Sequence, residues 1–260
     1  MVITQLKCFG SDAKTGNLAY VIENDAMDEI ARQQFAFEQN VPVCVFIDNI
    51  DGSKLELSFF YPHKKSPLCL HGSLAAAKVF FNKNPEITNI QIISSMGKTL
   101  TASLESQEEI FLKLVPEFIR DGGEYIDDAS KLLGIDIDDI LVKPIVASVG
   151  SPKLIIKVNT KEKLFSLKPD LAALNLWNEF VGINGIYAYC VENETIFARN
   201  FNHLDEKIED SATGVAAAAL SYALSASIKV IQGVNLDNSC LLDVRFDGDA
   251  VKITGNVFYL

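Results

Sequence analysis

Two Ala-rich segments that match at an offset of 142 residues most constrain the fold of this chain. When Gly72 is placed over Gly214, the three alanines at 75–77 fall on those at 217–219. Small side chains on nearly every face of a helix let packed strands approach it from all sides. We therefore interpret the chain as a weak internal duplication of two lobes, each with a small-residue helix at its centre. The alternative is a chance match, because Ala-rich helices are common.

Strand-like and helix-like patterns are mixed along the chain without a regular βαβα rhythm. This favours an α+β fold over a doubly wound sheet. Alternation of apolar and polar residues predicts strands at residues 55–59, 110–115, 153–158, 195–201 and 251–258. Helical periodicity predicts helices at residues 28–39 and 170–180, with weaker signals at 126–133 and 137–142.

The best candidate for a boundary between the lobes is the charged, glycine-containing segment 116–123. We predict an N-terminal lobe of residues 1–118 and a C-terminal lobe of residues 119–260. The final strand could return to the first lobe, which the sequence leaves open.

Charge and cysteine usage narrow the class of protein. The 260 residues carry a net charge of −11 and no basic patch, so nucleic acid and anionic membrane surfaces are poor candidate partners. We predict no membrane span and no signal peptide, because no apolar stretch reaches ~20 residues and the N-terminus lacks an apolar core. The five cysteines are widely spaced without a CxxC pair, which indicates reduced thiols in a cytoplasm.

The expected starts of the two Ala-rich helices are the candidate ligand site. The first helical turn offers unpaired backbone N–H groups and the positive end of the helix dipole, which favour a carboxylate or phosphate. Gly72 and Ser73 stand at the first start, and Thr213 and Gly214 at the second. The simpler alternative is that Ser73 and Thr213 only cap their helices.

Candidate proton-transfer groups precede both helices. His71 can give and take a proton near neutral pH, although a lone histidine is often structural. Glu209 and Asp210 precede the second helix and could either cap it or act as an acid or base. The three histidines, His63, His71 and His203, have no metal-ligand spacing, so we predict no metal site.

Six blocks of the sequence together resemble the phenazine-biosynthesis isomerase-like family, which shares the diaminopimelate epimerase fold. The most specific is the Glu-Asp-Ser-Ala-Thr-Gly motif that ends at Gly214. The blocks cover residues 16–21, 59–77, 148–154, 168–171, 182–187 and 198–214.

The resemblance implies two similar lobes, each a rolled sheet around a central helix, with the active site in a cleft between them. It also implies proton-transfer chemistry without a cofactor on a small carboxylate-bearing ligand, in a protein that is a homodimer. His71, Asp210 and Gly214 match site positions of the family, and Gly72 and Ser73 fall where the family has small residues.

Three positions depart from the family pattern. The main proton-transfer glutamate of the family corresponds to Val43, which cannot carry a proton. Cys44 could replace it only after a slip of one residue, because neighbouring strand residues point to opposite faces. A position that is acidic in the family is occupied by Lys65 in this chain. A position that is glycine in the family is occupied by Leu70. Cys69, two residues before His71, is the other candidate thiol, although both thiols could be inert and buried.

Two main functions therefore remain open at the level of sequence. The first is an isomerase or epimerase in which His71 and Asp210 form the acid–base pair and the helix starts bind the substrate. The second is an inactive homologue that still binds a small molecule. A weaker alternative is a dimeric interaction protein whose cleft is vestigial.

Overall fold

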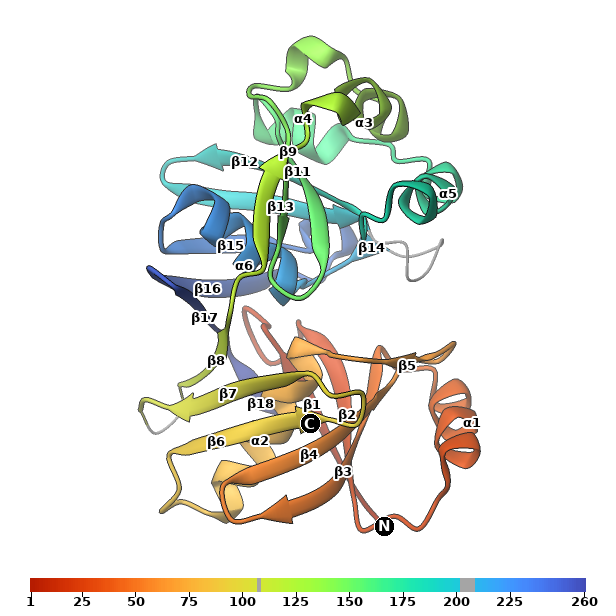
Figure 1. Ribbon diagram of the computed structural model, residues 1–260, viewed down its shortest axis with the longest axis vertical. Helices are drawn as coiled ribbons and strands as arrows, with labels where there is room; N and C mark the ends of the chain where they lie inside the picture. Colours follow the sequence, from red (N-terminus) through yellow and green to blue (C-terminus); the bar gives the residue numbers. More distant parts are fainter. Residues whose placement is uncertain (107–108, 202–208) are drawn as a thin grey trace. The chain divides into compact units, whose positions relative to one another are not determined.

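Two units divide the chain between Leu114 and Val115 (Figure 1). The structure is a computed structural model that describes residues 1–106, 109–201 and 209–260. Unit 1 comprises Met1–Leu114 and Lys252–Leu260, and unit 2 comprises Val115–Val251. The division falls four residues before the predicted one, because Phe118–Asp121 (β9) pairs with Ile145–Ser148 (β10) of unit 2. The last residues belong to unit 1, where Val257–Tyr259 (β18) pairs with Val2–Cys8 (β1).

The remaining strands follow the chain through the two units. Unit 1 contains Asn17–Glu23 (β2), Val43–Asp51 (β3), Lys54–Phe60 (β4), Lys65–Ser66 (β5), Asn89–Ser94 (β6), Thr99–Leu104 (β7) and Ile110–Leu114 (β8). Unit 2 contains Pro152–Lys157 (β11), Ile186–Glu192 (β12), Thr195–Phe201 (β13), Glu209–Asp210 (β14), Ile228–Gln232 (β15) and Cys240–Asp247 (β16). The chain returns from unit 2 to unit 1 within Ala250–Thr254 (β17).

The two units have the same strand pairing, which shows the internal duplication in the fold. In unit 1, β1–β2, β3–β4, β4–β5 and β6–β7 are antiparallel, whereas β2–β3 and β4–β6 are parallel. In unit 2, β10 to β16 repeat this pattern pair for pair. Each of these strands of unit 1 therefore has a topological counterpart in unit 2.

Each sheet is rolled around one of the two Ala-rich helices. These are Leu70–Lys83 (α2) in unit 1 and Gly214–Leu224 (α6) in unit 2. Residues 75–77 and 216–219, all alanines, are fully buried, because a methyl group leaves room for strands on every side. The α+β class and the two similar lobes predicted from the sequence are confirmed.

The other helices lie outside the rolled sheets. Glu29–Gln39 (α1) connects β2 to β3, and Lys161–Ser166 (α4) and Leu171–Val181 (α5) connect β11 to β12 (Figure 1). Ile126–Leu133 (α3) precedes β10. Short 3-10 helices cover Gly123–Tyr125, Ile137–Asp139 and Val234–Leu236.

Local sequence signals located most of these elements. Asp28 and Asp170 cap α1 and α5 by accepting a hydrogen bond from the N–H three residues on, at 2.8 and 3.0 Å. The helix predicted at 137–142 is wrong beyond residue 139, because Ile140 forms a β-bridge with Val158 instead. The single strand predicted at 251–258 is two strands, β17 and β18, and Asn256 between them hydrogen-bonds to Gly10.

Alternation along the strands gives the sheet of unit 2 two faces. Its outer face packs against α3, α4 and α5 through a cluster that includes Leu154, Ile156, Ile186 and Phe201. Residues one position away point to the opposite, inner face, the side of α6. This inner face of the sheet carries the polar residues that form the candidate site in unit 2.

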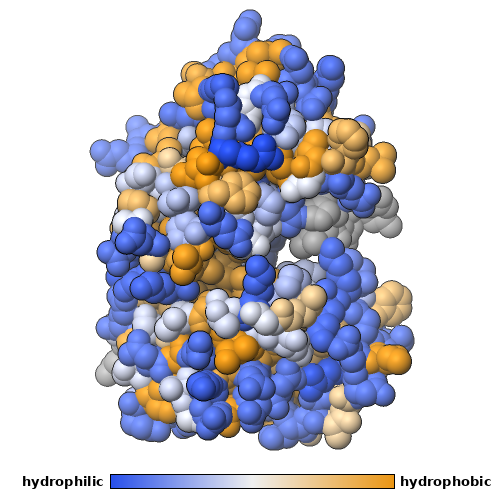
Figure 2. Space-filling view, in the orientation of Figure 1, coloured by the Kyte–Doolittle hydropathy of each residue, from blue (hydrophilic) through white to orange (hydrophobic). Residues whose placement is uncertain are grey.

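The face drawn in Figure 2 is mainly hydrophilic, with smaller hydrophobic areas between, as is normal for protein surfaces. None of the helices in the described ranges combines the length and the apolar character that crossing a bilayer requires.

Candidate functional site

The start of α2 holds His71 in its first turn. The helix begins at Leu70, two residues earlier than the predicted start at Gly72, and Cys69 at the N-cap makes no side-chain capping bond. The Cys69 thiol lies 3.4 Å from His71 Nδ1. The Cys8 thiol donates to the carbonyl of His71 at 3.2 Å. The imidazole of His71 is partly exposed. It lies beside the Cys69 thiol at the N-terminal, positive end of the α2 dipole.

Ser73 and Gly72 have structural tasks in this turn. Both the N–H and the hydroxyl of Ser73 donate to the carbonyl of Cys69, each at 2.8 Å. A Cβ added to Gly72 would lie 2.7 Å from Val45 Cγ2, so glycine lets α2 approach β3 closely. The N–H of Gly72 belongs to the first turn, where a helix supplies no acceptor of its own.

Val43 lies on the face of β3 that points toward α2. It shares this face with Val45, which contacts Gly72, and it is fully buried. Cys44 points the other way, into a cluster with Ala36 and Phe60 beside α1, and burial raises the pKa of its thiol to about 12. The strand register runs without a shift from Val43 to Phe46, so the slip that would bring Cys44 to the inner face is absent there.

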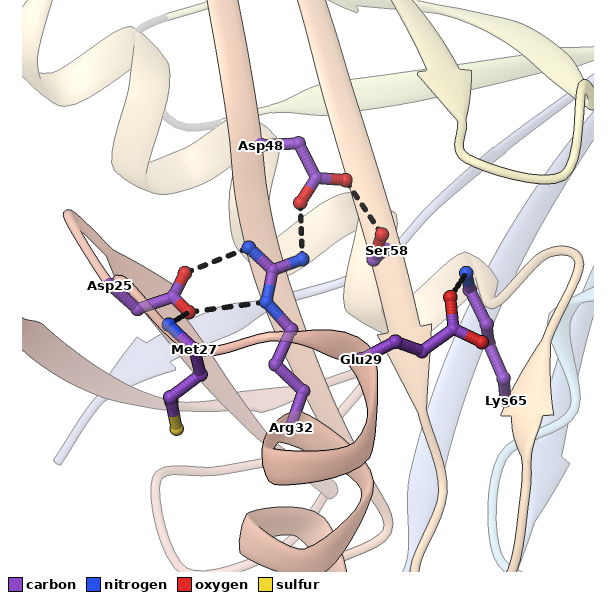
Figure 3. Close-up of polar contacts among 7 residues, drawn as sticks. All are labelled: Asp25, Met27, Glu29, Arg32, Asp48, Ser58 and Lys65. Atoms are coloured by element: carbon purple, nitrogen blue, oxygen red, sulfur yellow. Dashed lines mark hydrogen bonds and ion pairs between the residues drawn. The ribbon is translucent and has the colours of Figure 1, made fainter.

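Lys65 is engaged in an ion pair on the outer side of unit 1. Its ammonium group binds Glu29 of α1 at 2.6 Å (Figure 3). In the same view Arg32 binds both Asp25 and Asp48, and Ser58 donates to Asp48 at 2.6 Å. These contacts fasten α1 to its sheet. Leu70, the third departure, is 4% exposed at the start of α2 and packs as a core residue.

The start of α6 holds Asp210 in a buried hydrogen-bond network. The hydroxyl of Thr213, the N-cap residue, donates to Asp210 Oδ2 at 2.6 Å. Gln232 donates to the carbonyl of Asp210 at 2.7 Å and accepts from the Thr213 N–H at 3.3 Å. Tyr187 donates to the same Gln232 oxygen at 3.2 Å. The network holds the carboxylate of Asp210 at the positive end of α6.

The two carboxylates of the Glu209–Asp210 pair have different roles. Glu209 faces outward and forms a two-point ion pair with Arg199, at 2.9 and 2.7 Å, in which both side chains are less than 10% exposed. Arg199 also donates to the carbonyls of Leu164 and Leu167. Glu209 is therefore a structural group, whereas Asp210, on the opposite face of β14, is the candidate acid or base.

The predicted site residues fall into two groups, one in each unit. His71, Gly72, Ser73, Cys69, Cys44 and Val43 belong to unit 1, and Asp210, Thr213 and Gly214 belong to unit 2. Sequence reasoning missed Tyr187 and Gln232, because a polar residue inside a strand pattern does not reveal which face it occupies. His203 lies outside the described residues. Within the described ranges, no three His, Cys, Asp or Glu side chains converge to hold a metal ion.

Unit 1 also has an open surface cavity of about 750 Å³ between α1 and the segment after β4. Gln33, Phe37, Phe60, His63 and Lys65 are among its lining residues. Of the residues singled out from the sequence, His63 and Lys65 reach it, whereas His71 is not part of its lining.

Comparison with known proteins gives a consistent result over nearly the whole chain. The family model described as "Phenazine biosynthesis-like protein" matches residues 6–259. A curated relative, the uncharacterized isomerase YddE of Escherichia coli K12, is 28% identical over 223 residues, which cover 82% of this chain and 75% of YddE.

Solved structures share the fold at lower sequence identity. A phenazine biosynthesis protein of Bacillus anthracis superposes with a TM-score of 0.83 at 18% identity, covering 99% of this chain and 96% of that one. A predicted epimerase of Pseudomonas aeruginosa, PA4716, superposes with a TM-score of 0.81 at 22% identity and the same coverage.

Proposed function

The chain belongs to the phenazine biosynthesis-like family, and on that premise we propose that it isomerises or epimerises a small carboxylate by proton transfer without a cofactor. The observation that carries the proposal is the different treatment of two adjacent carboxylates. Glu209 is held by the Arg199 guanidinium, whereas Asp210 accepts from the hydroxyl of Thr213 at the start of α6. A fold that only needed a charge at this helix start would not require the surrounding network of Thr213, Gln232 and Tyr187.

In the proposed reaction, His71 and Asp210 are the acid–base pair. One group removes a proton from a carbon next to an activating group, and the electron pair left behind is delocalised. The proton returns to another carbon in an isomerisation, or to the opposite face of the same carbon in an epimerisation. The Cys69 thiol, 3.4 Å from His71, can exchange a proton with the imidazole.

The substrate carboxylate is proposed to bind the first turns of α2 and α6. Gly72 and Gly214 would contribute backbone N–H groups there. Ser73 and Thr213 would shape the two turns and contact the ligand little through their own N–H or hydroxyl groups, since Cys69, Gln232 and Asp210 already accept from them.

The second candidate function is a binding protein that has lost the chemistry. Val43 favours it, because a fully buried valine stands where the family resemblance places a glutamate. Loss of one acid–base group typically costs about 100- to 10,000-fold in rate. Such a protein would still bind an anion at the helix starts.

Proton exchange in deuterated water separates the two functions. The protein is incubated with cyclic and amino-acid-like carboxylates, and exchange at carbon is followed by NMR for wild type and Asp210→Asn. We expect exchange with wild type and its loss in Asp210→Asn. Asp249→Asn, which changes an exposed carboxylate in the same way, is the matched control. Binding without exchange above background by wild type would support the binding protein instead.

We further propose a homodimer in the cytoplasm. All five cysteines are buried thiols, which suits a reducing compartment. Sedimentation velocity tests the dimer, and a single monomeric species at micromolar concentration would contradict it.

A further inference from the structure

The outer face of α5 is apolar although it is exposed to solvent. Leu176 is 70% exposed and Phe180 is 90% exposed, and Ala172, one turn before Leu176, is exposed as well. These three residues are spaced by four, so they form a single ridge along the helix. In Figure 2, hydrophobic surface gathers where Figure 1 places α5. The proposed site at the start of α6 makes no use of this ridge.

The opposite face of α5 already fastens the helix to unit 2. Leu174 belongs to the buried cluster on the outer side of the sheet, and Leu171, Trp177 and Val181 pack against that cluster. A helix that is apolar on all sides is normally buried on all sides. The exposed ridge is not needed for the packing within unit 2, and an exposed apolar surface of this kind is typical of a contact between proteins.

The corresponding helix of unit 1 shows that the fold does not require such a ridge. α1 has the same place in the topology and also exposes two large apolar residues, Ile30 and Phe37. These two are seven residues apart, and Gln34 and Glu38 are exposed beside them. In α5, by contrast, the only charged residue is Glu179. The continuous apolar ridge is therefore a property of α5 itself.

We propose that α5 is the contact surface for a second copy of this chain, in a two-fold antiparallel helix pair centred on Leu176. The ridge is complementary to itself in size, because the two-fold axis places the large Phe180 against the small Ala172 of the second copy. It is also complementary in charge, since Glu179 comes to lie opposite Ala173 and not opposite its own copy. Ridges with a spacing of four residues form the commonest type of helix packing.

This contact names the interface of the proposed homodimer, and it rests on that part of the proposed function and not on the isomerase activity. The 11 residues of α5 span about 16 Å at the rise of an α-helix. A pair of such helices buries less than the roughly 1,600 Å² of a standard protein interface. We therefore expect a dissociation constant in the micromolar range, and a dimer that dissociates on dilution.

Sedimentation velocity over a dilution series compares wild type, Phe180→Glu and Phe37→Glu. Phe180→Glu should weaken dimerisation by about 100-fold or more, because the contact would bury two carboxylates without a partner. Phe37→Glu makes the same change at an exposed phenylalanine of α1, and it should leave the dissociation constant unchanged. Both phenylalanines are more than half exposed, so both variants should fold, which circular dichroism checks.

A size swap tests the antiparallel register. Ala172→Phe alone places two large rings against each other, and Phe180→Ala alone leaves a gap. Each should weaken dimerisation by about tenfold or more. The double variant again has one large and one small side chain at each contact, so its dissociation constant should return close to that of wild type.

The proposal is overturned if Phe180→Glu dimerises as wild type does, or if the double variant dimerises no more strongly than the two single variants. A dimer that persists in Phe180→Glu would leave the homodimer standing and place its interface elsewhere. A monomeric wild type throughout the micromolar range would remove both the homodimer and the α5 contact.

Discussion

The hydroxyl of Thr213 donates to Asp210 Oδ2 at 2.6 Å, just before the first residue of α6. The contact links the N-cap residue of the helix to the carboxylate proposed as an acid or base. It makes the position of the carboxylate depend on a short side chain that cannot rotate freely, since Gln232 also donates to the hydroxyl oxygen at 3.1 Å.

Thr213→Val should distinguish the contribution of the Thr213 hydroxyl from the contribution of the shape of its side chain. The variant loses the bond to Asp210, so we expect a free energy of unfolding lower by about 1–3 kcal/mol and slower proton exchange. Urea denaturation and NMR exchange measure the two effects. Thr213→Ser, which keeps the hydroxyl, should retain exchange; a Thr213→Val variant with the exchange rate and stability of wild type would contradict the role of the hydroxyl bond.

Val43→Glu should restore a proton-transfer group on the face of β3 toward α2. If the resemblance assigns this position correctly, exchange should rise by about 100-fold or more over wild type. Val43→Gln has nearly the same shape without a titrating group, and it should show no increase. Both variants should be less stable than wild type by about 1–3 kcal/mol, because each buries a polar group. A similar exchange rate in the two variants would contradict the assignment.

Arg199→Met should destabilise unit 2 strongly. It leaves the Glu209 carboxylate buried without its ion pair and removes the donors to Leu164 and Leu167, at an expected cost of about 3–5 kcal/mol in the free energy of unfolding. Lys143→Met breaks an exposed ion pair with Asp121, and it should change the free energy little. A small effect of Arg199→Met in urea denaturation would show that the buried pair contributes no more than a surface pair.

Lys153 should make the stability of wild type depend on pH. The ordinary lysine pKa of 10.5 applies to the unfolded chain, and burial lowers the folded value to about 8, so between these values the unfolded chain binds more protons. The free energy of unfolding of wild type should therefore rise relative to Lys153→Met as pH increases from about 8 to 10.5. The full gain is about 3 kcal/mol at 1.36 kcal/mol per pH unit. Burial also raises the pKa of Tyr187, but this group is present in both proteins and cancels. A pH-independent difference would place the ammonium group of Lys153 in contact with solvent.

The sequence by itself determined the fold class and most local elements. Short-range signals were enough for α1 and α5, because Asp28 and Asp170 cap them and their periodicity is strong. The repeated Ala-rich helices identified the two similar units, because only small side chains fit a helix surrounded by strands. The sequence also located Asp210 and Thr213 together, since they are three residues apart.

Only the tertiary structure decided which polar groups surround Asp210. Alternation shows which strand residues share a face, but not which face points inward, so it could not separate Asp210 from Glu209. The partners of Asp210 are also distant in sequence: Gln232 follows by 22 residues, and Asn200 meets it through strand pairing. Lys153 looks like an ordinary strand lysine until the rolled sheet buries it. Burial and partner choice arise from packing between segments, and local sequence carries no direct signal of either.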